Sequence, residues 1–135
     1  MRTHVEFCSS EFPAEPGEVE HINPGRFGKR LADYIAQHLP AHGFSVAAIA
    51  AEDWGWMVEL TNEDFPLWIG CGNYEEFPNG FLCFIEPSKP FFRKFLRKVD
   101  TTTTVAKLAS ALEALLLDSG KVSNLRWWSE TEVRT

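Results

Sequence analysis

The sequence is short of cysteine, of long apolar runs and of positive charge, and each shortage argues against a class of protein. Three cysteines are an odd number, so we expect no disulfide framework and a cytoplasmic location. No apolar run approaches the roughly 18 residues of a membrane span, and the first residues lack the apolar stretch of a secretory signal. A net charge of −6 argues against nucleic acid, because phosphate binding needs a dominant positive field. We therefore expect neither a membrane nor a nucleic-acid partner.

What is present is an ordinary globular composition. The chain has 135 residues, of which 44% are hydrophobic and 24% charged. This length suits one domain, and a domain of this size buries enough surface to fold without metals or disulfides. We predict a single α+β domain over 1–128, followed by a flexible C-terminal tail over 129–135.

Charge is unevenly distributed along the chain. Seven acids and no lysine or arginine lie between Glu52 and Glu76, whereas five bases and no acid lie between Lys89 and Lys98. The molecule is therefore expected to be dipolar. The acidic stretch favours a basic partner or a cation, or it serves only solubility.

Apolar periodicity predicts a sheet with helices packed on it. Strands are expected at 4–8, 44–51, 54–60, 65–72, 81–86 and 122–128, and helices at 24–39, 91–99 and 104–117. Asn23 and Pro24 suit the start of the first helix, and apolar residues form one stripe along the last. The short connections favour a mainly antiparallel meander of four to six strands with two to three helices, in the order β-α-β-β-β-β-α-α-β.

The expected strand at 65–72 is apolar on both faces. Leu67, Ile69 and Cys71 alternate with Trp68, Gly70 and Gly72, and a strand of this kind is usually buried on both sides. The second face should therefore meet the last helix, another subunit in a homodimer, or a ligand. Gly70 and Gly72 beside Trp68 either form the floor of a pocket or make room for an aromatic ring from a neighbouring strand.

Two expected hairpin connections place acids and aromatics at one end of the meander, because alternate turns lie at the same end. The residues gathered there are Glu52, Asp53, Trp54, Tyr74, Glu75, Glu76 and Phe77. Aromatic rings supply contact area and carboxylates steer a basic partner surface. The alternatives are a solvated acidic rim and a site for a metal or small ligand, although no spacing matches a calcium loop.

The motifs of enzyme chemistry are weak or missing. No G-x-S-x-G elbow or C-x-x-C pair occurs, so the sequence points to no catalytic residue, metal site or cofactor. Arg26, Lys29 and Arg30 lie at an expected helix N-terminus and are a candidate anion site. Cys71 and Cys83 alternate with core residues and are expected to be buried, unreactive thiols.

The stretches AEDWGWMVEL and FPLWIGCGNYEEFPNGFLCFIEPSKP resemble a family of small bacterial proteins with no assigned activity. The resemblance implies a bacterial, soluble, single-domain protein. It transfers no catalytic residue, and so does not choose a function.

Together these features favour a non-enzymatic protein-binding module, of the adaptor or immunity type, that uses an acidic, aromatic-rich surface to hold a basic partner. The competing hypothesis is a small-molecule-binding protein or an enzyme, with its pocket on the sheet face near Trp68, Gly70 and Gly72. The state of the second sheet face distinguishes the two.

Overall fold

The computed structural model describes residues 1–129 and 131–132, so the greater part of the tail expected at 129–135 lies outside the described residues. The elements, in chain order, are β1 (His4–Cys8), α1 (Glu18–His21), α2 (Lys29–His38), the 3₁₀ helix η1 (Leu39–His42), β2 (Val46–Glu52), β3 (Gly55–Leu60), β4 (Leu67–Asn73), β5 (Gly80–Glu86), β6 (Phe91–Lys94), β7 (Arg97–Asp100), α3 (Thr102–Asp118) and β8 (Ser123–Trp128).

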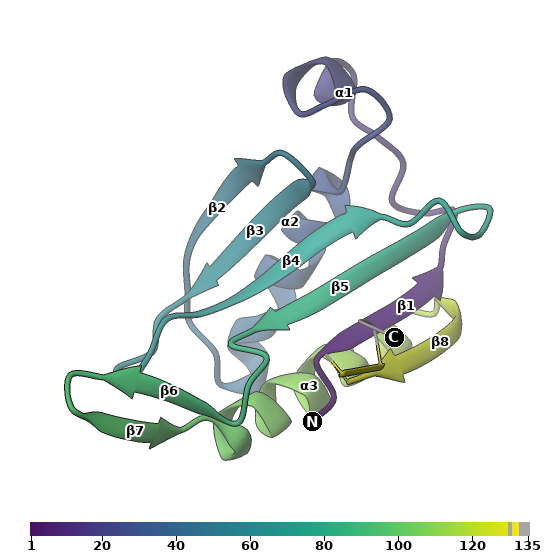
Figure 1. Ribbon diagram of the computed structural model, residues 1–135. Helices are drawn as coiled ribbons and strands as arrows, with labels where there is room; N and C mark the ends of the chain where they lie inside the picture. Colours follow the sequence, from purple (N-terminus) through teal and green to yellow (C-terminus); the bar gives the residue numbers. More distant parts are fainter. Residues whose placement is uncertain (130, 133–135) are drawn as a thin grey trace.

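The main sheet has six strands in the order β2-β3-β4-β5-β1-β8. Every neighbouring pair is antiparallel, which confirms the α+β class and the mainly antiparallel sheet. The meander runs from β2 to β5, and the N-terminal strand β1 then lies between β5 and the C-terminal strand β8 (Figure 1). The first and last strands, β1 and β8, are therefore neighbours at one edge of the sheet.

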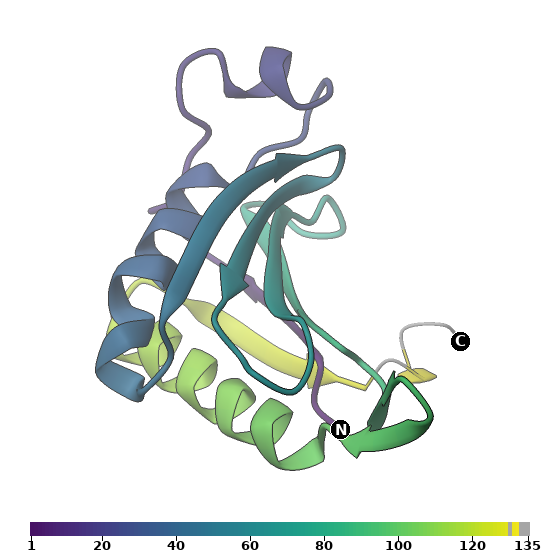
Figure 2. The ribbon, with the colours of Figure 1, turned by 90° about the vertical axis from the view of Figure 1, so that its left-hand side faces the viewer.

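Helices α2 and α3 pack on one face of this sheet (Figure 2). The apolar stripe predicted for the last helix is confirmed, and its buried members are Val105, Leu108, Ala109, Leu112, Leu115 and Leu116. Opposite them, alternate strand residues such as Val5, Ile69 and Ile85 are fully buried. The last helix therefore does not cover the second face of the sheet.

The helix predicted at 91–99 is wrong, because this segment forms the hairpin β6–β7. Its inward residues are Phe92 and Val99, which are register partners and pack against the core. A nine-residue segment is too short to be a stable helix by itself, so a contact between distant residues decides its conformation. The hairpin turn consists of Phe95 and Leu96, which lie between Lys94 and Arg97.

The predicted start of the first long helix at Asn23 and Pro24 is also wrong. Helix α2 begins at Lys29 with Gly28 as its N-cap residue. Segment 23–28 is an irregular connection, in which the Asn23 side chain donates to the Asp53 carbonyl at 2.7 Å. A tertiary contact uses the side chain that was expected to cap the helix.

Cys71 and Cys83 are register partners on β4 and β5, and both are fully buried free thiols. Their mutual hydrogen bond is the largest cause, and burial the second, of a pKa for Cys71 raised well above its ordinary value. A protonated buried thiol is a poor nucleophile.

We expect all three thiols to stay reduced and the midpoint of thermal unfolding to be the same with and without reductant. Mass spectrometry after alkylation checks this, and a Cys71–Cys83 disulfide whose reduction destabilises the fold would contradict it.

Candidate functional site

The sheet face opposite α2 and α3, here called the open face, is the candidate functional surface. Among the described residues no helix covers it, and hairpin β6–β7 extends on its side of the sheet (Figure 2). The strand register places one row of residues across all six strands of this face: Ala50, Met57, Gly70, Phe84, His4 and Trp128. The row is largely apolar, as is typical of a face that meets a partner.

Three aromatic rings form a cluster at the centre of the open face. The ring centroid of Trp54 lies 5.0 Å from that of Phe84 and 6.0 Å from that of Trp68, and Trp68 meets Phe84 edge-on at 5.5 Å. All three side chains are half-buried. Pairs with these separations attract each other beyond simple area burial. The cluster is therefore a rigid apolar platform that still reaches solvent.

The glycine floor beside Trp68 is filled by this cluster. A Cβ atom at Gly70 would overlap the Phe84 ring, and one at Gly72 would lie 2.9 Å from the Trp54 carbonyl oxygen. Of the two interpretations of these glycines, the structure favours the one in which they make room for an aromatic ring. The pocket expected over Gly70 and Gly72 is occupied by the protein's own side chain and backbone.

An open groove adjoins Trp68 on the side of the β3–β4 connection. It has a volume of about 700 Å³ and lies between the open face, the β3–β4 connection and hairpin β6–β7. Met57, Trp68 and Phe92 supply apolar lining, and the charged lining residues are Lys94 and the three acids Glu59, Glu63 and Asp64. Sequence reasoning missed this groove because the hairpin that forms one wall was expected to be a helix.

The four carboxylates Glu52, Asp53, Glu75 and Glu76, here called the acidic rim, lie on the β2–β3 turn and the β4–β5 loop. Segment 23–28, which carries Arg26, bridges these two connections. The Asn23 side chain donates to the Asp53 carbonyl, and the Asn73 side chain donates to the Gly25 carbonyl at 2.8 Å. A Cβ at Gly25 would lie 3.5 Å from a Glu75 carboxylate oxygen. Segment 23–28 therefore lies between the two acidic connections and contacts both, a bridge that the sequence analysis did not foresee.

The aromatic residues expected on the rim divide between two surfaces. The Trp54 ring lies on the open face, whereas Tyr74 and Phe77 stay on the β4–β5 loop with ring centroids 5.7 Å apart. Burial, and then the charges of Glu76 and Glu6, raise the pKa of Tyr74, so its hydroxyl stays protonated at neutral pH. Glu6 is a buried residue of β1.

A small hollow, here called the rim pocket, opens beside Tyr74. Its volume is about 430 Å³ and it is lined by Phe27, Asn73, Tyr74, Glu75, Phe77, Pro78, Asn79 and Gly80. The Phe77 side chain is 42% exposed. The rim pocket therefore has a mixed lining, in which aromatic rings alternate with the polar groups of Asn73, Glu75 and Asn79.

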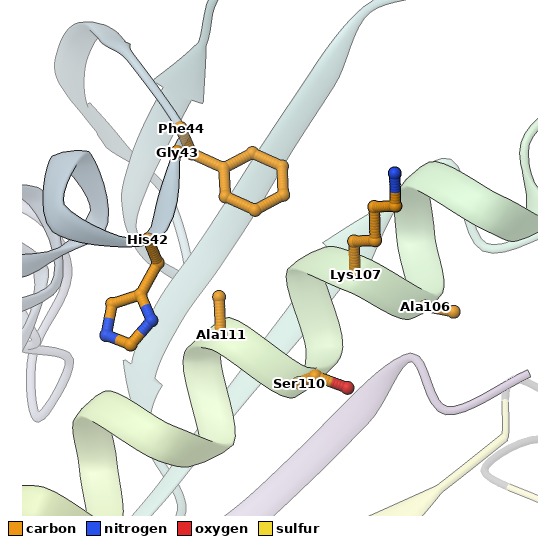
Figure 3. A pocket seen from close by; sticks show the side chains of 7 residues that line it. All are labelled: His42, Gly43, Phe44, Ala106, Lys107, Ser110 and Ala111. Carbon is orange, nitrogen blue, oxygen red and sulfur yellow. The ribbon is translucent and has the colours of Figure 1, made fainter.

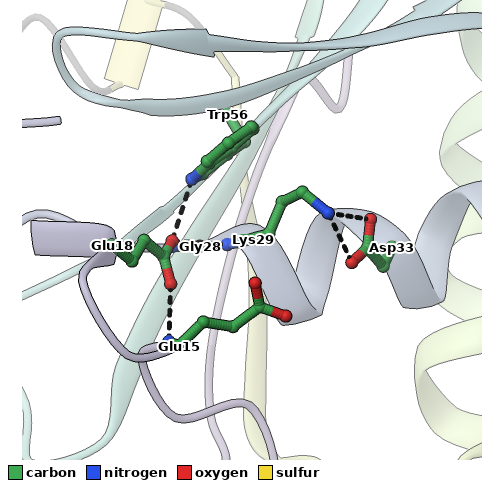
Figure 4. Close-up of polar contacts among 6 residues, drawn as sticks. All are labelled: Glu15, Glu18, Gly28, Lys29, Asp33 and Trp56. Atoms are coloured by element: carbon green, nitrogen blue, oxygen red, sulfur yellow. Dashed lines mark hydrogen bonds and ion pairs between the residues drawn. The ribbon is translucent and has the colours of Figure 1, made fainter. Parts of the chain in front are cut away.

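The anion site expected at Arg26, Lys29 and Arg30 already holds an internal anion. One carboxylate oxygen of the buried Glu18 accepts hydrogen bonds from the backbone N–H groups of Gly28 and Lys29, at 2.7 and 2.8 Å (Figure 4). The Lys29 ammonium is bonded to Asp33 at 2.7 and 2.8 Å. A negative charge does bind at this helix N-terminus, but it comes from the chain itself, and an external anion would compete for the same donors.

A further hollow lies on the helix side, between η1 and α3 (Figure 3). Its volume is about 640 Å³, and its lining residues are His42, Gly43, Phe44, Ala106, Lys107, Ser110 and Ala111.

Within residues 1–129 and 131–132, no group of three or more His, Cys, Asp or Glu side chains is placed to hold a metal ion. The His38 ring packs on Tyr34, with ring centroids 4.3 Å apart.

No family model, curated protein or solved structure matches the chain. The resemblance to small bacterial proteins stays a prediction. In the part of the chain that the structure describes, no helix has the length and apolar character needed to cross a membrane.

Proposed function

We propose that this protein is a non-enzymatic binding module, of the adaptor or immunity type, which holds a basic protein partner on the open face and the acidic rim. The observation that carries the proposal is the half-exposed cluster of Trp54, Trp68 and Phe84 on a sheet face that no described helix covers. Tryptophan is among the residues that contribute most to protein interfaces, because its large rigid ring gives contact area at little entropic cost.

The charges around the cluster support a basic partner. The rim carboxylates are exposed at one end of the strands, and Glu59 is exposed on the open face itself. Carboxylates at the edge of an interface raise the rate of encounter with a positive surface, and the aromatic centre then supplies the contact area that slows dissociation.

Loss of the Trp68 ring tests the proposal. A randomised peptide display library, selected on the immobilised protein, is expected to yield peptides rich in Lys and Arg. Trp68→Ala should weaken their binding by about tenfold or more, as removal of a central aromatic does. The matched control is Leu117→Ala, because Leu117 is 54% exposed on α3, away from the open face. Selected peptides without basic character, or peptides that bind both variants equally, would contradict the proposal.

Charge reversal at Glu75 and Glu76 tests the acidic rim. Both side chains are exposed, so Glu75→Lys with Glu76→Lys should change the free energy of unfolding by less than about 1 kcal/mol. The same double variant should slow association with basic peptides and reduce its dependence on salt, because steering is electrostatic. Stopped-flow association rates at two ionic strengths check this. Unchanged rates would remove the rim from the interface, and unfolding would show that the carboxylates are structural.

The groove beside Trp68 favours a second candidate function, which is the binding of a small amphipathic ligand. Its apolar floor with Lys94 and Glu59 at the side suits a ligand that carries a polar group. Trp68 is one of five tryptophans and lines this groove, so the part of the emission that is lost in Trp68→Phe reports on it. A ligand that quenches Trp68 emission and loses affinity in Phe92→Ala would support a small-molecule site, whereas a basic peptide should bind this variant normally.

A further inference from the structure

The tip of hairpin β6–β7 exposes an apolar pair that the fold does not need. The Phe95 and Leu96 side chains are 94% and 102% exposed, and they form the loop between Lys94 and Arg97. Phe95 also has φ +57°, a conformation that a side chain disfavours and that glycine commonly supplies in such loops. An aromatic residue here costs stability and buries nothing in the free chain. Strain of this kind is expected where the side chain makes a contact outside its own fold.

Cations lie directly behind this apolar tip on both strands. Lys94 and Arg97 are register partners next to the loop, and Arg93 and Lys98 are the next pair. Like charges opposite each other on neighbouring strands destabilise a hairpin, and in the part of the chain that the structure describes none of the four forms an ion pair. The Lys98 ammonium lies 4.5 Å from the Phe91 ring centroid. The charge of the tip is therefore not neutralised by any described carboxylate.

Two acids lie near the groove side of the hairpin. Glu63 and Asp64 line the groove together with Lys94, and the Lys94 ammonium donates to the Glu63 carbonyl at 3.5 Å. Lys94 therefore belongs to the groove wall, whereas the other three cations of the hairpin are exposed.

The acidic rim is too far from the hairpin to cancel this local positive charge. The β2–β3 turn and the β4–β5 loop lie at the other end of the sheet (Figure 1). The seven residues of β4 separate the two ends by about 20 Å, and exposed charges are largely screened beyond a Debye length of about 8 Å at physiological ionic strength. The hairpin tip therefore acts as a basic surface although the whole chain is acidic.

An apolar tip with cations behind it matches the layered chemistry of an anionic lipid bilayer. The boundary between headgroups and acyl chains accepts phenylalanine and leucine side chains. The negative surface of the bilayer attracts lysine and arginine, each of which raises the affinity by about fivefold. A nucleic acid strand could stack a base on Phe95, but Leu96 would gain nothing from that contact. A lipid surface uses both side chains.

We propose that hairpin β6–β7 docks this protein on the surface of an anionic lipid bilayer. Phe95 and Leu96 enter the boundary between headgroups and acyl chains, and Arg93, Arg97 and Lys98 contact lipid phosphates. One short apolar tip with a basic patch gives weak, reversible attachment. The sequence argued against a membrane partner because it lacks an apolar run of spanning length, but peripheral attachment needs no such run. The inference uses neither the open face nor the acidic rim, and so goes beyond the proposed function.

Vesicle sedimentation with the full chain tests the inference. Vesicles of equal parts phosphatidylcholine and phosphatidylglycerol should bind the protein, and added salt should weaken the binding. Vesicles of phosphatidylcholine alone should bind about tenfold more weakly or worse, because they present no net negative charge to the exposed cations. Arg93→Gln with Arg97→Gln should lower the affinity for the mixed vesicles by about tenfold or more.

Two further variants separate docking from general effects. Arg30→Gln with Lys121→Gln removes the same charge at exposed positions outside the hairpin and should leave binding unchanged. Phe95→Asn with Leu96→Gly supplies the loop that two-residue hairpins favour. This variant should raise the midpoint of thermal unfolding and yet weaken binding to the mixed vesicles by about tenfold. A tip that served only the fold would not separate these two effects.

The inference is overturned if the mixed vesicles do not bind the chain, if phosphatidylcholine vesicles bind it equally well, or if either hairpin variant binds as wild type does. Equal loss of binding in Arg30→Gln with Lys121→Gln would also overturn it. Tighter binding of a thymidine oligonucleotide or of polyglutamate than of the mixed vesicles would assign the tip to another class of partner. The proposed function is tested separately, because basic peptides selected on the protein should keep their affinity for Phe95→Asn with Leu96→Gly.

Discussion

Glu18→Gln is expected to lower the free energy of unfolding by about 2–4 kcal/mol, because it removes a buried charge that accepts several hydrogen bonds. The Glu18 carboxylate accepts from the backbone N–H groups of Glu15, Gly28 and Lys29 and from the Trp56 indole N–H, all at 2.7–2.8 Å (Figure 4). Glutamine keeps one acceptor oxygen, but its amide N–H₂ group cannot accept a hydrogen bond. Glutamine is also neutral, so the negative charge that complements the N-terminus of α2 is lost.

The dependence of this effect on pH has a defined sign. Burial raises the pKa of Glu18, but the hydrogen bonds from Glu15, Gly28, Lys29 and Trp56 together outweigh it, and the pKa is lowered from its ordinary value of 4.5. The stabilisation is therefore complete above about pH 4.5 and is lost as the pH falls through the lower, folded-state pKa. The difference between wild type and Glu18→Gln should be constant near neutral pH and shrink in acid.

Urea denaturation from neutral pH down to pH 3 measures this difference. Glu20→Gln is the matched control, because Glu20 belongs to the same helix α1 but is exposed, and it should change the free energy of unfolding by less than about 0.5 kcal/mol. A Glu18→Gln effect that stays the same down to pH 3 would show that the side-chain shape, and not the charge, is responsible.

Leu112→Ala is expected to lower the free energy of unfolding by about 2–5 kcal/mol, because it leaves a cavity between α3 and the sheet. The Leu112 side chain is fully buried at the middle of the α3 stripe. Chemical denaturation measures the change as a lower midpoint with an unchanged slope. Leu117→Ala on the same helix is the control, since Leu117 is 54% exposed. Equal effects at both positions would mean that the packed side of α3 is misplaced.

Periodicity in the sequence was enough to predict most of the sheet and the last helix. Alternation along β3, β4 and β5 repeats every two residues, and the stripe on α3 follows the helical period. These patterns arise within a single helix or strand. They can therefore be recognised in the sequence without knowing which other element that helix or strand packs against. The double-sided apolar character of β4 is present in the structure, with Ile69 and Cys71 fully buried against the helices and Trp68 half-buried on the open face; the last helix does not cover that face, and cover by a subunit or a ligand stays a prediction.

Elements whose conformation depends on distant contacts were predicted wrongly. Hairpin β6–β7 exists because Phe92 and Val99 meet across it and pack on the core, whereas the local pattern of RKFLRK suits a short helix equally well. The start of α2 is set by Glu18, which lies ten residues before Gly28 in sequence. No local capping signal identifies a carboxylate that reaches a helix from another segment.

The candidate site divides in the same way. The rim acids could be grouped from the sequence, because alternate turns of a meander lie at one end, and the glycines beside Trp68 could be identified as a place where a side chain is missing. Which ring fills that place is decided by strand register, which sets Phe84 opposite Gly70. The direction of Trp54, the bridge formed by segment 23–28 and the exposure of Phe95 and Leu96 depend on packing between elements far apart in the chain. Tertiary structure alone decides them, because side-chain direction at a turn follows from the neighbours that the turn meets and not from its own residues.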